Sequence, residues 1–362
     1  MMRIMKMHGT KTNRGFSLLE LMVAMVIGLM VMAAMTSLFK AGIDSTFIVS
    51  QRAETQENMR AAIGILTKDI NLAGAGLPTG GIQLPTGAGS TAQRFGCDQV
   101  GTCYVPAFNY AGNYMYGIIP GFSNGVQGNA VINSAPGQIN DSITIIYADY
   151  NFPMFQYNVT FPGGSTGGLV NVAPNPAFVP APVAINSPGG IQVGDLILLS
   201  NSSGNAVGEV TGLTPTTISF ADADALNMNQ SGAASNNIKA IVVAPAVPTV
   251  AYRLFAVTYY LTVPAGGQLP RLMRQVNGLT PVPVADNIIN LQFAYDVYNS
   301  TNNALDANQA NPIGVGESPN LIQKINVAVM GESLTLGAKR SQNMYLATSL
   351  SARNMAYRNR YK

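Results

Sequence analysis

Residues 16–39 constrain the fold of this chain more than any other segment. They contain a single charged side chain, Glu20, and about 20 apolar residues suffice for a helix to cross a bilayer. The segment before them holds four basic residues and no acidic one: Arg3, Lys6, Lys11 and Arg14. Because basic flanks stay on the cytoplasmic side, the pattern predicts one membrane-spanning helix with the chain after Phe39 outside.

Glu20 is the unusual residue of this segment, because a carboxylate in hydrocarbon costs about 2.5–3.5 kcal/mol. One interpretation is that it satisfies the start of its own helix, where a carboxylate contributes about 0.3–1 kcal/mol. The other is that it pairs with a positive charge on another molecule. The residue types alone allow both.

The helical pattern continues past Phe39 but becomes one-sided. Apolar residues recur at spacings of three, four and six between charged ones, as in an amphipathic helix: Ile43, Phe47, Ala53, Met59, Ile63, Leu66 and Ile70. No proline precedes Pro78, and glycines before it allow a C-cap. We therefore predict one helix over 16–75, membrane-spanning over 16–39 and amphipathic over 40–75. From Phe16 to Ala73 it would be about 87 Å long at 1.5 Å per residue. A signal anchor followed by an unrelated helix is the alternative.

The rest of the chain, 76–362, has the pattern of an antiparallel β-rich domain with long Gly/Asn/Ser loops. Short runs between Gly, Pro and Asn predict strands over 142–150, 155–161, 191–200, 216–220, 239–244, 250–262, 287–298, 323–331 and 343–353. The longest connections are 105–140, 162–190 and 221–237. The expected fold class is α+β, a long N-terminal helix packed on this domain.

Charge and composition exclude several kinds of active site. The only histidine is His8, so a chain without residues 1–15 has no Ser-His-Asp or Cys-His catalytic set and no histidine metal site. Such a chain carries 20 − 4 = 16 basic and 17 acidic residues, so the net charge of +3 gives no reason to expect nucleic acid. We expect no enzyme activity and no cofactor. Asp222 and Asp224 lie in a small-residue loop and are interpreted as solvated.

Three further features have two interpretations each. Cys97 and Cys103 form a close pair beyond a membrane segment, which favours a disulfide over free thiols. Oxygen side chains at Asp296, Asn299, Asn302 and Asp306 are a weak candidate for Ca²⁺, with an ordinary hairpin loop as the favoured interpretation. A basic end, with Lys339, Arg340, Arg353, Arg358, Arg360 and Lys362, could contact DNA, but a solvated edge is favoured.

The order of features at the N-terminus resembles a known signature. Gly15-Phe16-Ser17-Leu18-Leu19-Glu20, after a basic leader and before an apolar helix, resembles the prepilin signature of type IV pilins and type II secretion pseudopilins. The resemblance implies that prepilin peptidase removes leader 1–15 by cutting between Gly15 and Phe16 and methylates Phe16. It also implies that Glu20 pairs with the terminal amine of a neighbouring subunit during assembly, and that the domain has the type IV pilin fold.

Later segments narrow the resemblance to minor pilins of the PilW type. The segments are Gln56 to Gly74, with Asn58, Arg60 and Asp69-Ile70, then Val193-Gly194-Asp195, Tyr259-Tyr260, Leu272 to Arg274, Ile288 to Asp296 and Ser349 to Asn354. The implied function is a non-enzymatic subunit that primes or modifies a type IV pilus. Its partners would be other pilins, prepilin peptidase, the inner membrane and the assembly platform, with the C-terminus periplasmic and later in the pilus. Alternatives are a J-type pseudopilin and a single-pass anchored binding module.

Overall fold

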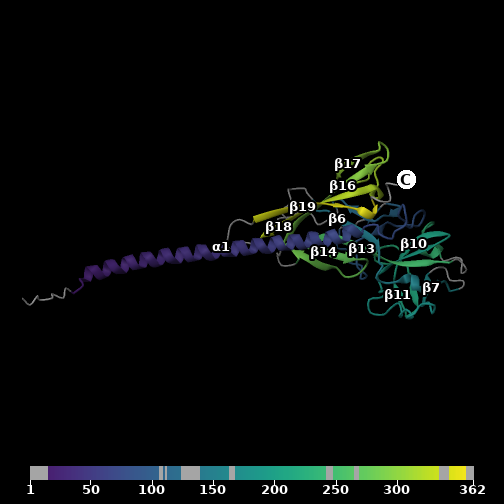
Figure 1. Ribbon diagram of the computed structural model, residues 1–362, viewed down its shortest axis with the longest axis horizontal. Helices are drawn as coiled ribbons and strands as arrows, with labels where there is room; N and C mark the ends of the chain where they lie inside the picture. The colour runs from purple at the N-terminus through teal and green to yellow at the C-terminus, as the bar shows by residue number, and fades with distance from the viewer. Residues whose placement is uncertain are drawn as a thin grey trace, which may run out of the picture. The chain divides into compact units, whose positions relative to one another are not determined.

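The computed structural model describes residues 15–105, 109–110, 112–123, 139–162, 168–241, 248–264, 269–333 and 342–355. The chain divides into two units, Met1–Ala53 and Glu54–Lys362, and each is described by itself. The leader residues 1–14 lie outside the described part. Figure 1 shows the helix α1 and the labelled strands.

The N-terminal helix α1 spans Leu18–Leu72 without a break, which confirms the long helix predicted from the sequence. It ends earlier than predicted, because Gly74 adopts a left-handed φ of 76° and its N–H bonds to the Ile146 carbonyl of the domain at 2.8 Å. The left-handed region favours glycine, which has no Cβ to clash. The glycine therefore turns the chain out of the helix.

The largest sheet of the domain has seven strands, and every pairing in it is antiparallel. Its central strand β13 pairs with β6 along one edge and with β9 and then β14 along the other. The strands are β5 (Ile118–Gly121), β6 (Ser142–Ala148), β9 (Leu196–Asn201), β10 (Gly204–Glu209), β13 (Val250–Thr262), β14 (Arg271–Val276) and β15 (Val282–Asp286).

Two four-stranded antiparallel sheets complete most of the domain. One has the order β11-β12-β8-β7, from β7 (Tyr157–Thr160), β8 (Leu169–Pro174), β11 (Gly212–Leu213) and β12 (Thr217–Ser219). The other has the order β17-β16-β18-β19, from β16 (Ile288–Asn299), β17 (Ala304–Gln309), β18 (Ile322–Ser333) and β19 (Gln342–Ser351).

The remaining elements are short. They are the strands β1 (Ile82–Gln83), β2 (Gln93–Arg94), β3 (Asn109–Tyr110) and β4 (Tyr114–Met115), the helix α2 (Ile238–Ile241), and 3-10 turns at Met154–Gln156 and Pro319–Leu321.

The part of α1 within the domain buries one face against the main core. Its buried residues follow helical spacing: Thr55, Met59, Ala62, Leu66, Asp69 and Ile70. They pack with apolar residues of β6, β13, β14, β16 and β18. The helix approaches the sheet closely at Gly331 of β18, where an added Cβ would lie 2.8 Å from Met59 Sδ and 2.8 Å from Thr55 Cγ2. Glycine at this position allows the helix to lie directly on the sheet.

The strand prediction is wrong over its 239–244 segment, where the described residues begin a helical turn. Ile238 and Ile241 are both buried, and this spacing of three suits one face of a helix better than alternating strand faces. The predicted loop 162–190 contains β8, and the predicted loop 105–140 contains β3, β4 and β5. No strand was predicted at β10, β15 or β17.

Candidate functional site

The start of α1 is closed by a capping box formed by Ser17 and Glu20. The Glu20 oxygen Oε2 accepts hydrogen bonds from the Ser17 N–H at 3.0 Å and the Ser17 hydroxyl at 3.2 Å. In return, the Glu20 N–H donates to Ser17 Oγ at 3.2 Å. This reciprocal pairing satisfies two N–H groups at the helix start. The helix therefore begins just after Gly15 and Phe16, and the Phe16 side chain is 87% exposed.

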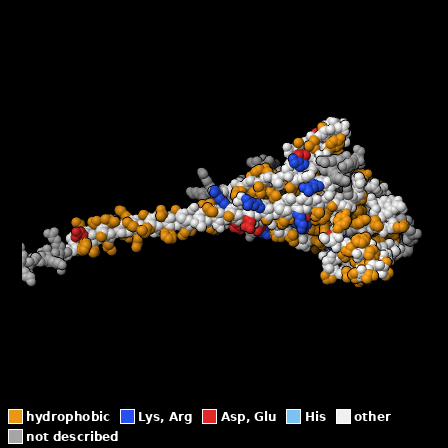
Figure 2. Space-filling view, viewed as in Figure 1, with side chains coloured by type: hydrophobic (Ala, Val, Ile, Leu, Met, Phe, Trp, Pro, Cys, Tyr) orange, Lys and Arg blue, Asp and Glu red, His pale blue; other side chains and the backbone are white. Residues whose placement is uncertain are grey.

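The first part of α1 presents apolar side chains to its surroundings on all sides. Every described side chain from Gly15 to Thr46 is exposed, and Figure 2 shows hydrophobic side chains along this stretch. By length and composition α1 is able to cross a membrane. Such a surface requires lipid or other apolar helices around it, because its exposure to water is unfavourable.

A buried polar cluster ties the C-terminal part of α1 to the largest sheet. Asp69 is 2% exposed and accepts hydrogen bonds from Tyr259 at 2.6 Å, Tyr147 at 3.2 Å and Arg274 Nε at 2.8 Å. Burial and the Asp69 charge raise the pKa of both tyrosines. Burial lowers the pKa of Arg274, but the hydrogen bond and charge of Asp69 outweigh it and raise that pKa.

Sequence reasoning did not identify this cluster as a unit, although one signal was present. Asp69 lies three residues after Leu66, on the face of the helix that is otherwise apolar. A charge in that position needs a buried partner. Its partners lie far along the chain, so periodicity alone could not name them.

The two cysteines are joined by a disulfide, with Cα atoms 4.0 Å apart. The loop between them is organised by Asp98, whose Oδ1 accepts from the N–H groups of Val100 at 3.2 Å and Thr102 at 2.9 Å. The Tyr104 hydroxyl donates to Asp98 Oδ2 at 2.5 Å, and this hydrogen bond raises the pKa of Tyr104.

The four candidate calcium ligands all make hydrogen bonds within the β16–β17 hairpin. Asp296 accepts from the Asn308 N–H at 3.0 Å, Asn302 accepts from the Ala304 N–H at 2.9 Å, and Asn299 donates to Asp306 at 2.7 Å. Among the described residues no group of three His, Cys, Asp or Glu side chains could hold a metal. The arrangement is that of a hairpin loop.

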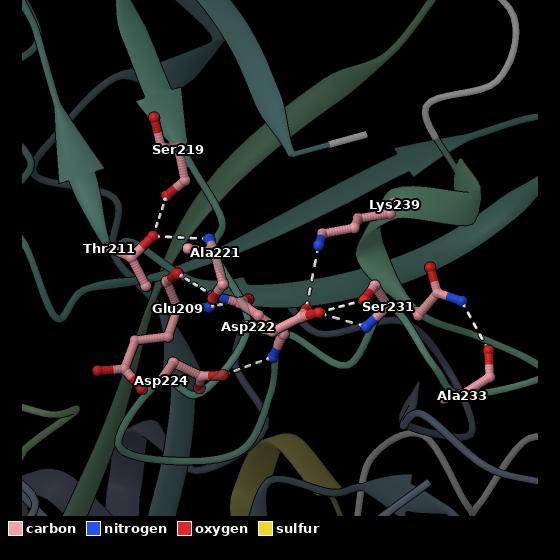
Figure 3. A network of polar contacts seen from close by, with 11 residues as sticks. Glu209, Thr211, Ser219, Ala221, Asp222, Asp224, Ser231, Ala233 and Lys239 are labelled. Carbon is pink, nitrogen blue, oxygen red and sulfur yellow. Dashed lines mark hydrogen bonds and ion pairs between the residues drawn. The ribbon is translucent and has the colours of Figure 1, made fainter. Parts of the chain in front are cut away.

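The interpretation of Asp224 as solvated is wrong, whereas Asp222 lies at the surface. Asp222 is paired with Lys239 at 3.1 Å. Asp224 is buried, accepts from the Met228 and Asn229 N–H groups at 2.7 and 2.8 Å, and is hydrogen-bonded to Glu209. Figure 3 shows the two carboxyl groups beside each other. Burial, and then the Asp224 hydrogen bond and charge, raise the pKa of Glu209 to about 9.

Of the basic residues near the C-terminus, only Arg353 belongs to the described part, where it is exposed. Lys339, Arg340, Arg358, Arg360 and Lys362 lie outside it. A DNA contact by this end therefore stays a prediction.

Comparison with known proteins bears on the N-terminus. A family model described as a prokaryotic N-terminal methylation motif matches residues 10–36, a range that includes Gly15, Phe16 and Glu20. No curated protein and no solved structure matches the chain. The motif supports a type IV pilin-like or pseudopilin-like precursor, a class that is in general structural and non-enzymatic. It implies processing by prepilin peptidase and assembly with other pilins. The apolar helix and the motif are consistent with membrane anchoring.

Proposed function

We propose that this chain is a PilW-type minor pilin, which is held in the inner membrane and then primes or modifies a type IV pilus. The observation that carries the proposal is the methylation motif over residues 10–36, followed directly by a helix whose first part is apolar on every side. A subunit with this surface is stable only where lipid or other apolar helices cover the helix. The β-rich domain would then lie in the periplasm and later on the pilus.

The assembly step follows from the geometry around Glu20. Cleavage after Gly15 would leave a positive amine on Phe16, four residues before the carboxylate. Glu20 uses Oε2 for the capping box, while no hydrogen bond joins its Oε1 to another described residue. One oxygen can therefore cap the helix while the other accepts the ammonium of a neighbouring subunit. The two interpretations of Glu20 are compatible.

Pairing of this kind sets the axial position of one subunit against the next. A buried ammonium and a buried carboxylate are each costly alone, and pairing offsets both desolvation costs. The apolar surface supplies cohesion but is not directional, so the charge pair supplies the register.

A substitution of Glu20 by glutamine separates capping from charge pairing. Glutamine also completes a capping box, so Glu20→Gln keeps the cap and removes the charge. We expect normal processing but pilus numbers reduced at least ~10-fold, as in Glu20→Ala, which corresponds to about 1.4 kcal/mol. Ser17→Ala is the matched control, because it weakens the cap and keeps the charge. Normal piliation in Glu20→Gln would show that the residue only caps its helix.

Mass spectrometry of the mature N-terminus tests the first step. We expect a chain that begins with methylated Phe16. A chain that keeps residues 1–15, in cells where other pilins are processed, would favour an anchored binding module instead.

A further inference from the structure

The outer face of the sheet β17-β16-β18-β19 contains a hollow of about 750 Å³. Strand register explains its shape. The middle cross-strand row is Gln292–Ala328–Ala347, and two alanines form its floor. The neighbouring row, Asn290–Met330–Tyr345, is taller and forms one wall. We call this hollow the outer trough and define it by these six residues.

The described residues that line the outer trough are uncharged. They combine amides, hydroxyls, alanines, Val327, Met330 and two aromatic residues, and none of these described residues is Asp, Glu, Lys, Arg or His. A phosphate, a nucleic acid or a metal ion would find no opposite charge in it, although such ligands depend on one. The composition matches an uncharged ligand.

Asn290 gives the trough an amide that can bond to a ligand. The residue is 8% exposed and its side chain lines the hollow, yet its amide makes no hydrogen bond to any residue in the described part of the chain. Because the amide lines an open hollow, its donor and acceptor groups are accessible to a ligand that enters it. A ligand with hydroxyl or carbonyl groups would satisfy this amide, whereas an apolar ligand would not.

The opposite wall is already held in place by hydrogen bonds. Asn326 donates to Asn308 Oδ1 at 2.7 Å and accepts from the Ser349 hydroxyl at 2.5 Å. The Gln292 amide nitrogen donates to the Ile139 carbonyl at 3.0 Å, which fixes that side chain. Groups held in this way lose little freedom when a ligand binds. The Asn308 amide nitrogen and the Gln292 side-chain carbonyl make no hydrogen bond to another described residue.

We propose that the outer trough binds an uncharged saccharide, with hydroxyls on the amides of Asn290 and Gln292 and an apolar ring face on Tyr345. The Tyr345 side chain is 65% exposed and offers an aromatic face with a polar tip. The volume lies within the range of small-molecule sites. A peptide strand would instead pair with the free edge of β19, because the backbone groups under the trough are already used in the sheet. An apolar helix would leave Asn290 unsatisfied.

The test uses the full-length protein in a phosphocholine detergent, since a detergent with a sugar headgroup would compete. The neutral probes are maltotriose, cellotriose and triacetylchitotriose, and sialyllactose is the anionic comparison. Saturation-transfer NMR detects binding, and titration measures the Kd of each probe. Ala347→Phe fills the floor. Ala304→Phe adds the same bulk at an exposed position of β17 that does not line the hollow, and it is the matched control.

We expect at least one neutral trisaccharide to bind with a Kd of about 1 mM or lower. The Kd should rise at least ~10-fold in Ala347→Phe. In Ala304→Phe it should change less than ~2-fold. The proposal is overturned if no neutral probe binds up to about 10 mM, if Ala347→Phe binds as the wild type does, or if sialyllactose binds best. It is also overturned if sedimentation shows that only Ala347→Phe dissolves an oligomer, because the trough would then be covered by a second copy.

Discussion

Replacement of Asp69 by asparagine tests how the helix is fastened to the domain. The carboxylate accepts from three donors and pairs with Arg274, whose side chain is 25% exposed. Asparagine has nearly the same shape but only one acceptor oxygen; with that oxygen toward Arg274 and Tyr259, its NH₂ group would face the Tyr147 hydroxyl. The variant therefore removes the charge and at least one hydrogen bond without leaving a large cavity.

The expected loss of stability is about 3 kcal/mol. Removal of one partner from a buried ion pair costs about 3–5 kcal/mol, and the lower end applies because Arg274 is close enough to the surface to regain water. For a domain of this size, about 2 °C of melting temperature is lost per kcal/mol. The melting temperature should therefore fall by about 6 °C.

Differential scanning calorimetry of the full-length protein in detergent measures this loss. Asp286→Asn is the matched control, because Asp286 pairs with Arg271 at 3.3 Å while its side chain is 64% exposed, and exposed pairs contribute about 0–1 kcal/mol. If Asp69→Asn melts within about 1 °C of the wild type, or if the control loses as much, the Asp69 cluster does not hold the helix.

Two further predictions concern packing and pH. Gly331→Val should destabilise the protein by about 1–3 kcal/mol, because its side chain would collide with Met59; an unchanged urea midpoint would contradict this contact. The pKa of Glu209 is raised to about 9, so the folded state holds a proton that the unfolded state has released, and stability should fall as pH rises from about 4.5 to 9. Glu209→Gln has no such proton and keeps a donor for Asp224, so its melting temperature should decline less between pH 6 and pH 9; parallel declines would refute the assignment.

Local sequence pattern was sufficient for the helix and for the long strands. The sequence shows helical periodicity and no proline before Pro78. The predicted C-terminal end of the helix lay a few residues too far along the chain, because Gly74 leaves the helix and its N–H bonds to the Ile146 carbonyl. Long strands such as β13 and β16 were predicted from dense β-branched and aromatic residues. By contrast, β17 is mostly exposed and rich in Asp, Asn and Ala, residues that are depleted in strands.

The polar clusters could not be predicted because their members come from different elements. Asp69 of α1 meets Arg274 across 205 positions of the chain, and Glu209 at the end of β10 is separated from Asp224 by β11 and β12. The position of Asp69 on an apolar helix face indicated that it needs a partner, but no local pattern distinguished the buried Asp224 from the exposed Asp222. The N-terminal segment could be interpreted from the sequence because the methylation motif and the start of the helix lie within a few consecutive residues.

The Ser17–Glu20 capping box would also affect how the proposed leader 1–15 is removed. Proteases hydrolyse backbone that they can hold in an open conformation, and a peptide bond inside a helix is protected by its own hydrogen bonds. Since the cap stops α1 at Leu18, the bond between Gly15 and Phe16 stays outside the helix while the apolar segment behind it remains fully wound. Under the proposed cleavage between Gly15 and Phe16, the same two side chains would keep that bond accessible to a membrane peptidase and protect the rest of the helix from it.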